Sequence, residues 1–507
     1  MSSLAINGND LSFDALRQVV YERRPVALDA AAKERVVAAR EVVEKLLREN
    51  RVAYAINTGV GKLSDVHIEP AQNRQLQVNL IRSHSAGVGE PLTQEETRAM
   101  MLLRANSLAK GCSGVRPEVI DLLCAMLNAG IHPVVPSQGS VGASGDLAPL
   151  AHLALAMIGE GEVRAGNGRM SSAEALKRAG IKPLVPEAKE AISLINGTQA
   201  MLAVGALSLL AAENLAETAD VLGAMSLDAL HGTDVAFDER IHAARPHAGQ
   251  MKVAANLRRL IAGSEIRESH KDCGRVQDAY SLRCIPQVHG AVRDTLEFCR
   301  RTFEIEMNSA VDNPLVFTRG KGEGDIISGG NFHGEPLAFA LDFLAIALSA
   351  LAGISERRIE RLVNPALNEG LPPFLAAEAG INSGFMMPQV TAAALASENK
   401  VLAHPASVDS ITTSGNKEDY VSMGMAAAIK LKKVVANTTH VLAIEACAAA
   451  QALDFLAPLK TSKPLQKAHA GIRKVSPKIE KDRVFAEDFA RVAELIRSGA
   501  LPIGMDR

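Results

Sequence analysis

The chain has 507 residues, of which 47% are hydrophobic and 3% aromatic, and its formal net charge is −2 at pH 7. So small a charge offers no attraction to nucleic acid or to an anionic membrane, and a chain without Trp has little with which to stack on bases. We therefore expect a protein with a large buried core, and neither nucleic acid nor a membrane as its partner.

The N-terminus and the cysteines indicate where the protein works. The opening segment, MSSLAINGNDLSFDALRQVV, lacks the basic region and the apolar region of a secretory signal. The 6 cysteines are scattered and form no C-x-x-C pair, which is typical of buried thiols in a reducing compartment rather than of a disulfide framework or a zinc site. We expect a cytoplasmic protein that holds no metal.

Short elements joined by Gly- and Pro-rich connections fill the first 200 residues. The segment PLTQEETRAMMLLRANSLAKG predicts a helix capped by Thr93, because Glu96 follows three residues later and completes a capping box. The segment EGEVRAGNGRM predicts a small hairpin with its turn at Asn167-Gly168. We expect residues 1–200 to form a loop-rich head.

Long Ala- and Leu-rich stretches with almost no helix breakers follow the head. They lie at residues 201–230, 285–310, 335–363, 385–403 and 423–456. Helices that are apolar nearly all round must pack inside a bundle. One segment, LAFALDFLAIALSALAGI, is long enough to cross a membrane, but Asp342 interrupts it and helically spaced charges continue it, so we expect a bundle helix. The predicted fold is all-α, with the head at 1–200 and a long antiparallel helical bundle with C-terminal helices at 201–507.

Short polar segments interrupt this apolar background. They are YAINTGVG (54–61), SHSAGVG (83–89), GSVGASGDLAPL (139–150), NGTQA (196–200), VQDAYSLRCIPQ (276–287), DNPL (312–315), SGGNFHGEP (328–336) and SGNKEDYVSM (414–423). Each alone has an ordinary explanation: Asn and Gly cap helices, a lone His ends one, and Arg283 stacks on Tyr280 if both lie on one helical face. Their number, in a chain with few aromatic residues, predicts that they contribute to a site.

Several familiar chemistries are excluded by their missing motifs. The sequence has no H-E-x-x-H, no P-loop and no strand-bounded G-x-G-x-x-G, so it lacks the usual means for metal-dependent hydrolysis or nucleotide binding. The segment at 139–150 is not a nucleophile elbow either, because G-x-S-x-G would need Gly where Asp146 stands.

The segment GSVGASGDLAPL has the composition of a backbone that reacts with itself. The amide nitrogen of Gly145 is unhindered, and Gly142 and Gly145 reach backbone angles closed to other residues. In a compressed turn, the Gly145 nitrogen attacks the carbonyl carbon of Ala143 and closes a five-membered ring. Loss of water from the ring and of the Ser144 hydroxyl leaves an imidazolone with an exocyclic methylidene, and Asp146 is placed to move protons.

This segment strongly resembles the signature of the aromatic amino acid ammonia-lyases, whose Ala-Ser-Gly triad forms 4-methylidene-imidazole-5-one (MIO). The resemblance covers essentially the whole chain, because further family blocks follow in family order: NTGVG, LINGTQA, VQDAYSLRCIPQVHG, DNPLVF, SGGNFHGEP, ASENK and HPASVDS. It implies an MIO formed autocatalytically from Ala143, Ser144 and Gly145. It also implies a homotetramer, with the long-helix bundle at its core, in which each active site draws residues from three subunits.

The resemblance implies a small amino acid as the substrate, and it also indicates which amino acid this is. Ser83-His84 stands where the histidine ammonia-lyases of the family carry Ser-His, and Glu418 matches their acid where the phenylalanine enzymes carry Gln. It therefore implies a carbon–nitrogen lyase of histidine catabolism that converts L-histidine to trans-urocanate and ammonia without oxidation. The alternatives are a tyrosine or phenylalanine ammonia-lyase, an MIO-dependent 2,3-aminomutase and a catalytically silent relative.

By the same resemblance, residues from several polar segments take part in the reaction. Tyr54 and Tyr280 line the site, and one of them removes the β-proton of the substrate, Tyr54 being the favoured base. Arg283 binds the substrate carboxylate with its two-pronged guanidinium. The other expected substrate-binding residues are His84, Asn196, Gln277, Phe332 and Glu418.

The chain departs from the family pattern at four positions. Lys417 and Tyr420 replace the Gln and the His of Asn-Gln-Glu-Asp-His, and Val60 and Cys112 stand where Phe is common. A cation next to Glu418 affects how this acid meets the substrate. These departures therefore bear on turnover and substrate range rather than on the MIO.

Overall fold

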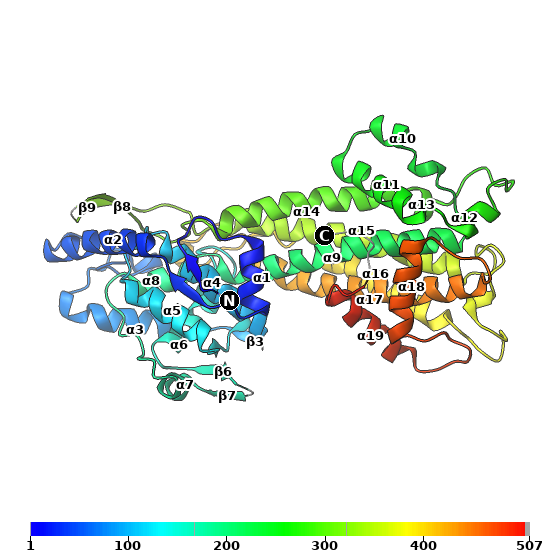
Figure 1. The fold of residues 1–507 in the computed structure, drawn as a ribbon. Coiled ribbons are helices and arrows are strands. Elements are labelled where there is room, and N and C mark those ends of the chain that lie inside the picture. The colour runs from blue at the N-terminus through cyan, green and yellow to red at the C-terminus, as the bar shows by residue number, and fades with distance from the viewer. Residues whose placement is uncertain (1, 167, 321, 502–507) are drawn as a thin grey trace. The chain divides into compact units, whose positions relative to one another are not determined.

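The computed structural model describes residues 2–166, 168–320 and 322–501, and Figure 1 labels most of its helices and strands. Helices dominate the described residues, which confirms the all-α fold predicted from the sequence. The chain divides into two compact units, each assembled from three stretches: Met1–Leu207, Arg300–Leu341 and Pro405–Ile429 form the first unit, and Ser208–Cys299, Asp342–His404 and Lys430–Arg507 form the second. The division at residue 200 into head and bundle stays a prediction, and the first unit also takes in two later stretches of the chain.

Among the described residues, the first unit holds eight complete helices and nine short strands. The helices are α1 (Phe13–Tyr21), α2 (Ala30–Arg48), α3 (Asn73–His84), α4 (Gln94–Ala109), α5 (Pro117–Asn128), α6 (Leu147–Met157), α7 (Ser172–Arg178) and α8 (Glu190–Ile195). The strands are β1 (Leu4–Ile6), β2 (Val26–Leu28), β3 (Val88–Pro91), β4 (His132–Pro133), β5 (Pro136–Gln138), β6 (Glu162–Ala165), β7 (Gly168–Ser171), β8 (Leu315–Gly320) and β9 (Glu323–Ile327). Loops and turns therefore make up much of this unit.

The strands form four small sheets rather than one large sheet. β6 and β7 pair antiparallel as the predicted hairpin, and Asn167 of its turn lies outside the described residues. β1 pairs with β2 in parallel, whereas β3 pairs with β5 and β8 with β9 in antiparallel. The sequence does not indicate these other strands, because most of them are too short to display an alternation of apolar and polar residues.

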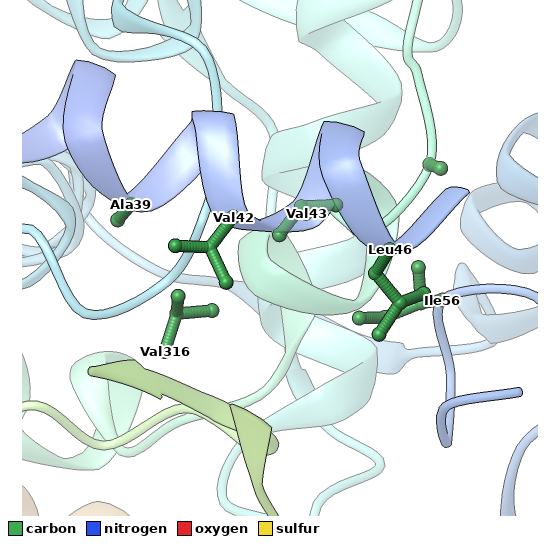
Figure 2. Packing of buried hydrophobic residues seen from close by; sticks show 7 residues of the cluster. Ala39, Val42, Val43, Leu46, Ile56 and Val316 are labelled. Atoms are coloured by element: carbon green, nitrogen blue, oxygen red, sulfur yellow. The ribbon is translucent and has the colours of Figure 1, made fainter. Parts of the chain in front are cut away.

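The apolar face of α2 builds one part of the core of the first unit (Figure 2). Four of its buried residues recur at helical spacing: Ala39, Val42, Val43 and Leu46. The cluster is completed by Ile56, Ala188 and Val316. Val316 belongs to β8, so this packing fixes the β8–β9 pair against α2.

Helix α4 is buried along almost its whole length, from Glu96 to Ala109. It begins at the predicted capping box: Thr93 Oγ1 accepts a hydrogen bond from Glu96 N at 3.2 Å, and the Glu96 carboxylate accepts one from Thr93 N at 2.7 Å. Helices α1, α2 and α5 pack against it. Its two buried arginines, Arg98 and Arg104, are therefore surrounded by protein groups rather than by water.

The second unit is built mainly from long helices. Four long helices have most of their residues in it: α9 (Gln199–Ala229), α14 (Ile285–Met307), α15 (Glu335–Val363) and α17 (Gly424–Phe455). The helices that lie wholly in it are α10 (Glu239–Ala243), α11 (Ala248–Ile261), α12 (Glu265–Ser269), α13 (Tyr280–Arg283), α16 (Met386–Leu402), α18 (Lys463–Val475) and α19 (Phe485–Arg497). Each predicted Ala- and Leu-rich stretch coincides with one of α9, α14, α15, α16 and α17.

Buried polar and charged side chains join the four long helices inside the second unit. His289 Nδ1 of α14 lies 2.8 Å from Asp220 Oδ1 of α9, and Arg358 Nη2 of α15 donates to Glu445 Oε2 of α17 at 2.9 Å. All four side chains are fully buried. A buried charge is stable only when its partner is in place, so these pairs favour one register of the helices over others.

Two helices are apolar enough to raise the membrane question again. Among the described residues, α9 and α15 pass as membrane-spanning segments by length and composition, and 72% and 61% of their apolar windows is buried inside the structure. Buried core helices pass the same test, so these two helices are weak evidence for a membrane span.

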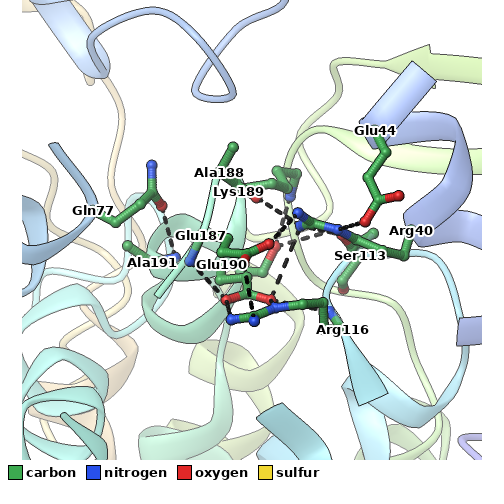
Figure 3. A network of polar contacts seen from close by, with 12 residues as sticks. Arg40, Glu44, Gln77, Ser113, Arg116, Glu187, Ala188, Lys189, Glu190 and Ala191 are labelled. Atoms are coloured by element: carbon green, nitrogen blue, oxygen red, sulfur yellow. Dashed lines mark hydrogen bonds and ion pairs between the residues drawn. The ribbon is translucent and has the colours of Figure 1, made fainter. Parts of the chain in front are cut away.

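A polar network fixes the start of α8 (Figure 3). Glu190 is fully buried, and its carboxylate accepts hydrogen bonds from Arg116 Nε, from Arg116 Nη2 and from Glu187 N, each at 2.8 Å. Arg40 donates to the Glu187 carboxylate at 2.9 Å and to the carbonyl of Ala188 at 3.0 Å. These bonds hold the turn that leads into α8.

We expect Glu190→Gln to lower the free energy of unfolding by about 3 kcal/mol, because an amide cannot replace the buried charge to which Arg116 is bonded. Glu44→Gln is the matched control, since Glu44 also bonds an arginine, Arg40, at 3.1 Å, but 44% of its side chain is exposed. An exposed acid of this kind contributes about 1 kcal/mol or less. Thermal and chemical unfolding at one protein concentration compares the two variants, and equal stabilities would contradict the prediction.

Candidate active site

A cavity of about 820 Å³ in the first unit brings together seven of the residues predicted for the site. These seven are Tyr54, His84, Ala143, Ser144, Asn196, Phe332 and Glu418. The helices α3, α6 and α8, labelled in Figure 1, pack against one another and place their ends at this cavity. Gly145, the eighth predicted residue in this unit, is buried next to Ser144.

The reactive loop, residues 140–146, connects β5 with α6. Gly142 and Gly145 have φ angles of 72° and 71°, in the left-handed region that favours glycine. The neighbouring atoms also leave little room for a side chain. A Cβ on Gly145 would lie 2.0 Å from Gly197 O, and a Cβ on Gly142 would lie 2.1 Å from Ser422 Oγ. Conformation therefore favours glycine at both positions, and packing against the Gly197 backbone also requires it at Gly145.

The Asn196–Gly197 turn, between α8 and α9, holds this loop. Gly145 and Gly197 form an isolated parallel β-bridge. Asp146 N donates to Gly197 O at 2.6 Å, and Gly197 N donates to Ser144 O at 3.3 Å. Asn196 Nδ2 donates to the same Ser144 oxygen at 3.2 Å. The Ser144 carbonyl therefore accepts two hydrogen bonds from one turn.

Asp146 anchors the C-terminal end of the loop. Its carboxylate accepts hydrogen bonds from Met201 N at 2.8 Å and from Ser140 Oγ at 2.9 Å. Burial raises the pKa of Asp146 to about 6, although both of these hydrogen bonds lower it. This carboxyl group therefore gains or loses a proton close to neutral pH.

Glu418 reaches the reactive loop from a distant part of the sequence. Its Oε1 accepts a hydrogen bond from the Ser144 hydroxyl at 3.0 Å, and its Oε2 accepts one from the Thr413 hydroxyl at 2.7 Å. Thr413 and Glu418 also form an isolated antiparallel bridge, which fixes the backbone that carries the acid. The carboxylate is thus held at the cavity wall next to Ser144.

His84 lies at the C-terminal end of α3 and lines the same cavity. Its Nδ1 lies 2.9 Å from the carbonyl oxygen of Leu80, and since a carbonyl only accepts, we infer that Nδ1 carries the proton. Burial lowers the pKa of His84, against the smaller opposing effects of the Leu80 carbonyl and of Glu418. The ring is therefore neutral at neutral pH, with Nε2 left as a hydrogen-bond acceptor.

Tyr54 and Phe332 supply two further walls of the cavity, and both are half-buried. The Tyr54 hydroxyl oxygen accepts a hydrogen bond from Gly61 N at 3.2 Å, which holds the phenol against its own loop. Phe332 follows β9 in the segment SGGNFHGEP. A phenol and a phenyl ring thus line the same cavity as Ala143 and Ser144.

Three predicted residues, Gln277, Tyr280 and Arg283, belong to the second unit and are not among the described residues that line this cavity. The Arg283 guanidinium lies over the Tyr280 ring, 4.5 Å from its centroid, and 71% of Tyr280 is exposed. Gln277 and Arg283 line a separate cavity of about 350 Å³ within the second unit. Arg283 Nε is buried without a hydrogen-bond partner among the described residues.

The cavity also contains residues that the sequence alone does not single out. Asn313, Ser328, Gly329 and His333 line it. All four lie in DNPL or SGGNFHGEP, so the polar character of these segments was the available signal. Their individual contributions depend on the tertiary structure, because the two segments flank the β8–β9 pair rather than share one helical face.

The four residues that depart from the family pattern do not all lie at the cavity. Val60, Lys417 and Tyr420 line the cavity, whereas Cys112 is not among its described lining residues. Lys417 is exposed, and no ion pair joins it to Glu418 in the part of the chain that the structure describes. The Tyr420 ring stacks on His333 with centroids 6.0 Å apart. Three of the four departures therefore alter the wall of the cavity.

The residues of the reactive loop fit the prosthetic group that the resemblance implies. Ala143 is small and 4% exposed, Gly145 has the turned-back conformation, and the Ser144 carbonyl has two donors in place. Asn196 Oδ1 is buried without a partner in the described structure and remains available as an acceptor. Across the described ranges, no group of three or more His, Cys, Asp or Glu residues is arranged to hold a metal ion.

Comparisons with known proteins agree with this geometry. A family profile described as aromatic amino acid lyase matches residues 11–474. The chain is 71% identical to a histidine ammonia-lyase of Koribacter versatilis over 510 aligned residues, which cover 99% of each chain. The crystal structure of histidine ammonia-lyase from Trypanosoma cruzi is similar with a TM-score of 0.91 and 46% identity, covering 98% of this chain and 94% of that one.

The similarity extends to a relative with a different named reaction. The structure of a tyrosine aminomutase from Streptomyces globisporus has a TM-score of 0.93 and 39% identity, covering 98% of this chain and 97% of that one. Fold similarity alone therefore does not distinguish the reactions within the group. The family profile and the full-length relatives do establish the group itself: the chain belongs to the aromatic amino acid lyase family.

Proposed function

We propose that the protein removes ammonia from L-histidine to give trans-urocanate, as a cytoplasmic homotetramer. The observation that carries this proposal is that His84 and Glu418, which differ in type between histidine and phenylalanine enzymes, line the same cavity as Ala143 and Ser144. The relative that is 71% identical, named histidine ammonia-lyase, supports the same substrate.

We infer that Ala143, Ser144 and Gly145 are converted to MIO, with loss of two water molecules. When present, this group supplies an electrophilic carbon that captures the substrate amine, or in an alternative mechanism its ring, and so makes ammonia a better leaving group. The chain contributes the conformation of Gly145, the donors on the Ser144 oxygen and the carboxyl group of Asp146. Because the pKa of Asp146 is about 6, it is suited to moving protons during ring closure near neutral pH.

The imidazole of histidine has two nitrogens that need polar partners, and the cavity offers two. The Nε2 of His84 accepts a hydrogen bond from one N–H of the protonated substrate ring, and the Glu418 carboxylate accepts the other and pairs with its charge. A phenyl ring would leave both acceptors without a donor. Sites built in this way discriminate strongly against apolar analogues, because buried polar groups are left unpaired.

Removal of the β-proton needs a base in front of the reactive loop. Tyr54 is the proposed base, since its phenol lines the cavity beside Ala143 and Ser144. Phe332 closes the wall of the cavity and excludes water from the reacting atoms. Tyr280 is the alternative base, and it belongs to the second unit.

We propose that Tyr280, Gln277 and Arg283 serve a cavity of another subunit in the homotetramer. Arg283 has an unpartnered buried Nε and a guanidinium suited to bidentate binding of the substrate carboxylate. Tyr280, which stacks with it, is 71% exposed. Exposed groups of this kind are expected where a residue acts on a neighbouring chain.

The first test is incubation with L-histidine while trans-urocanate is followed by its ultraviolet absorption and ammonia is assayed. We expect both products, and a loop peptide lighter than its sequence mass by two water molecules. Ser144→Ala should retain the full peptide mass and lose at least about 10³-fold in kcat, as other covalent catalysts do without their reactive group. A β-amino acid without free ammonia would instead identify an aminomutase.

We expect His84→Leu to lower kcat/KM for histidine by about 10- to 100-fold, the effect of losing one hydrogen bond in a buried site, and to raise kcat/KM for phenylalanine. Arg82→Met is the control, because Arg82 lies on the same helix end but forms a surface ion pair with Glu160. It should leave both values within about two-fold of wild type. Unchanged selectivity in His84→Leu would remove His84 from substrate recognition.

If each active site contains residues from different subunits, two inactive variants should restore activity when they assemble into one tetramer. Ser144→Ala and Arg283→Ala chains should each be nearly inactive alone, whereas co-expressed mixed tetramers should recover about a quarter of the wild-type sites by random mixing. Ser144→Ala mixed with Tyr54→Phe is the control, since both residues line one cavity of one chain and no mixture restores them together. Equal failure of the two mixtures would contradict shared sites.

A further inference from the structure

Arg104 is a fully buried cation on α4 that bonds to the turn beneath the reactive loop. Its Nη1 donates to Asn196 O at 2.7 Å and to Gln199 Oε1 at 2.9 Å. Its Nε and Nη2 have no hydrogen-bond partner, and no carboxylate pairs with it, among the described residues. The acid that acts on it at longer range, Asp312, is itself bonded to Lys189 at 2.7 Å.

A buried guanidinium without a counterion lowers the stability of the fold, because the charge has lost its hydration. A compensating role in the folded protein is therefore expected for Arg104. Burial lowers the pKa of Arg104 to about 10, and the side chain therefore still carries its charge at neutral pH. The other buried arginine of α4, Arg98, donates to Leu127 O at 3.1 Å and to Val19 O at 2.7 Å. Those bonds tie neighbouring helices together, whereas Arg104 bonds to the Asn196–Gly197 turn.

The Asn196–Gly197 peptide connects Arg104 to the reactive loop. Its carbonyl oxygen, on Asn196, accepts from the guanidinium, and its N–H, on Gly197, donates to Ser144 O at 3.3 Å. A charge on the carbonyl side of a peptide strengthens the N–H as a donor, because hydrogen bonds in a chain polarise one another. Gly197 has a φ of 146°, which other residues rarely adopt, and a Cβ there would lie 2.6 Å from Arg104 Nη1, so this position favours glycine.

We infer that Arg104 is a positioning residue that acts on Ser144 through the Asn196–Gly197 peptide. This inference rests on the proposed function, in which Ala143, Ser144 and Gly145 are converted to the electrophile. The guanidinium fixes the turn that holds the loop, and its charge strengthens the hydrogen bond on the Ser144 carbonyl. Fixed donors on this oxygen draw electron density from the adjoining carbon of Ser144, without reorganisation during the reaction.

The test replaces Arg104 by Met, which is of similar length and has no charge. Loss of a donor that contacts a reacting oxygen directly costs about 10²- to 10³-fold in kcat, so an effect relayed through one peptide is expected at about 10- to 100-fold. KM for histidine should stay within about three-fold, because Arg104 does not line the cavity. The near-ultraviolet absorption of the loop should shift or weaken, or its peptide should retain more of its unconverted mass.

Arg98→Met is the matched control, because it removes the other buried arginine of the same helix. It should lower the melting temperature but leave kcat and the near-ultraviolet absorption of the loop at wild-type values. A purely structural role for Arg104 predicts that the two variants behave alike. An equal fall in kcat for both, or a folded Arg104→Met with wild-type kcat and absorption, would overturn the inference.

Arg104→Lys decides the matter if Arg104→Met does not fold. Lysine keeps the charge but lacks the planar fork that reaches Asn196 and Gln199 together. We expect kcat between those of Met and wild type, with absorption shifted in the same direction. Wild-type kcat and absorption in Arg104→Lys would show that the guanidinium is not needed, and would overturn the inference.

The wild-type protein separates this inference from the proposed function. If the wild-type loop lacks the two-water mass difference and no urocanate forms, the proposed function fails and the inference fails with it. If the wild-type protein shows both and the Arg104 variants match it, the inference alone fails.

Discussion

The contact between Gly145 and Gly197 is the constraint on which the candidate site depends. The carbonyl oxygen of Gly197 occupies the space that any side chain on residue 145 would need, and the two backbones form a bridge. A left-handed φ and a close backbone approach coincide at Gly145, the residue whose amide nitrogen the proposed ring closure uses. The helices α6, α8 and α9 begin or end at this contact, so their packing maintains it.

Around this contact the first unit buries an unusual set of ionisable groups. Asp146 and Arg104 are both fully buried, and each bonds to uncharged groups near the loop rather than to an opposite charge. Ion pairs that only stabilise a fold are found elsewhere in the same unit, as between Glu190 and Arg116. Burial without a counterion raises the free energy of the charged form, and such groups are frequent where a protein prepares a reaction.

Much of the fold could be predicted from the sequence because its signals are local. The Thr93–Glu96 capping box and the long Ala- and Leu-rich helices were readable from spacing and composition alone. Apart from the β6–β7 hairpin, the short strands were not, since pairs such as β1 with β2 form between segments about 20 residues apart that carry no pattern of their own. The division of the chain into units of three stretches each is likewise set by tertiary packing.

The candidate site shows the same contrast. The sequence predicted Ser144, His84 and Glu418 as site residues, because polar residues of these types are unusual in an apolar background. All three line one cavity. The role of Arg104 was not predicted, because an arginine within an apolar helix is usually expected to extend its charged end into solvent. Its role depends on a bond to Asn196, 92 residues along the chain, which spacing does not reveal.

The hydrogen bond between the Ser144 hydroxyl and Glu418 has a consequence for how the enzyme matures. The hydroxyl that occupies Glu418 Oε1 is the same group that leaves as water when the proposed ring forms. In the proposed reaction, ring closure would therefore release one acceptor position on Glu418, the residue proposed to bind the substrate imidazole. Under that proposal, the dehydration that would create the electrophile would also increase the capacity of Glu418 to bind an imidazole ring, so chemical maturation and substrate recognition would be coupled.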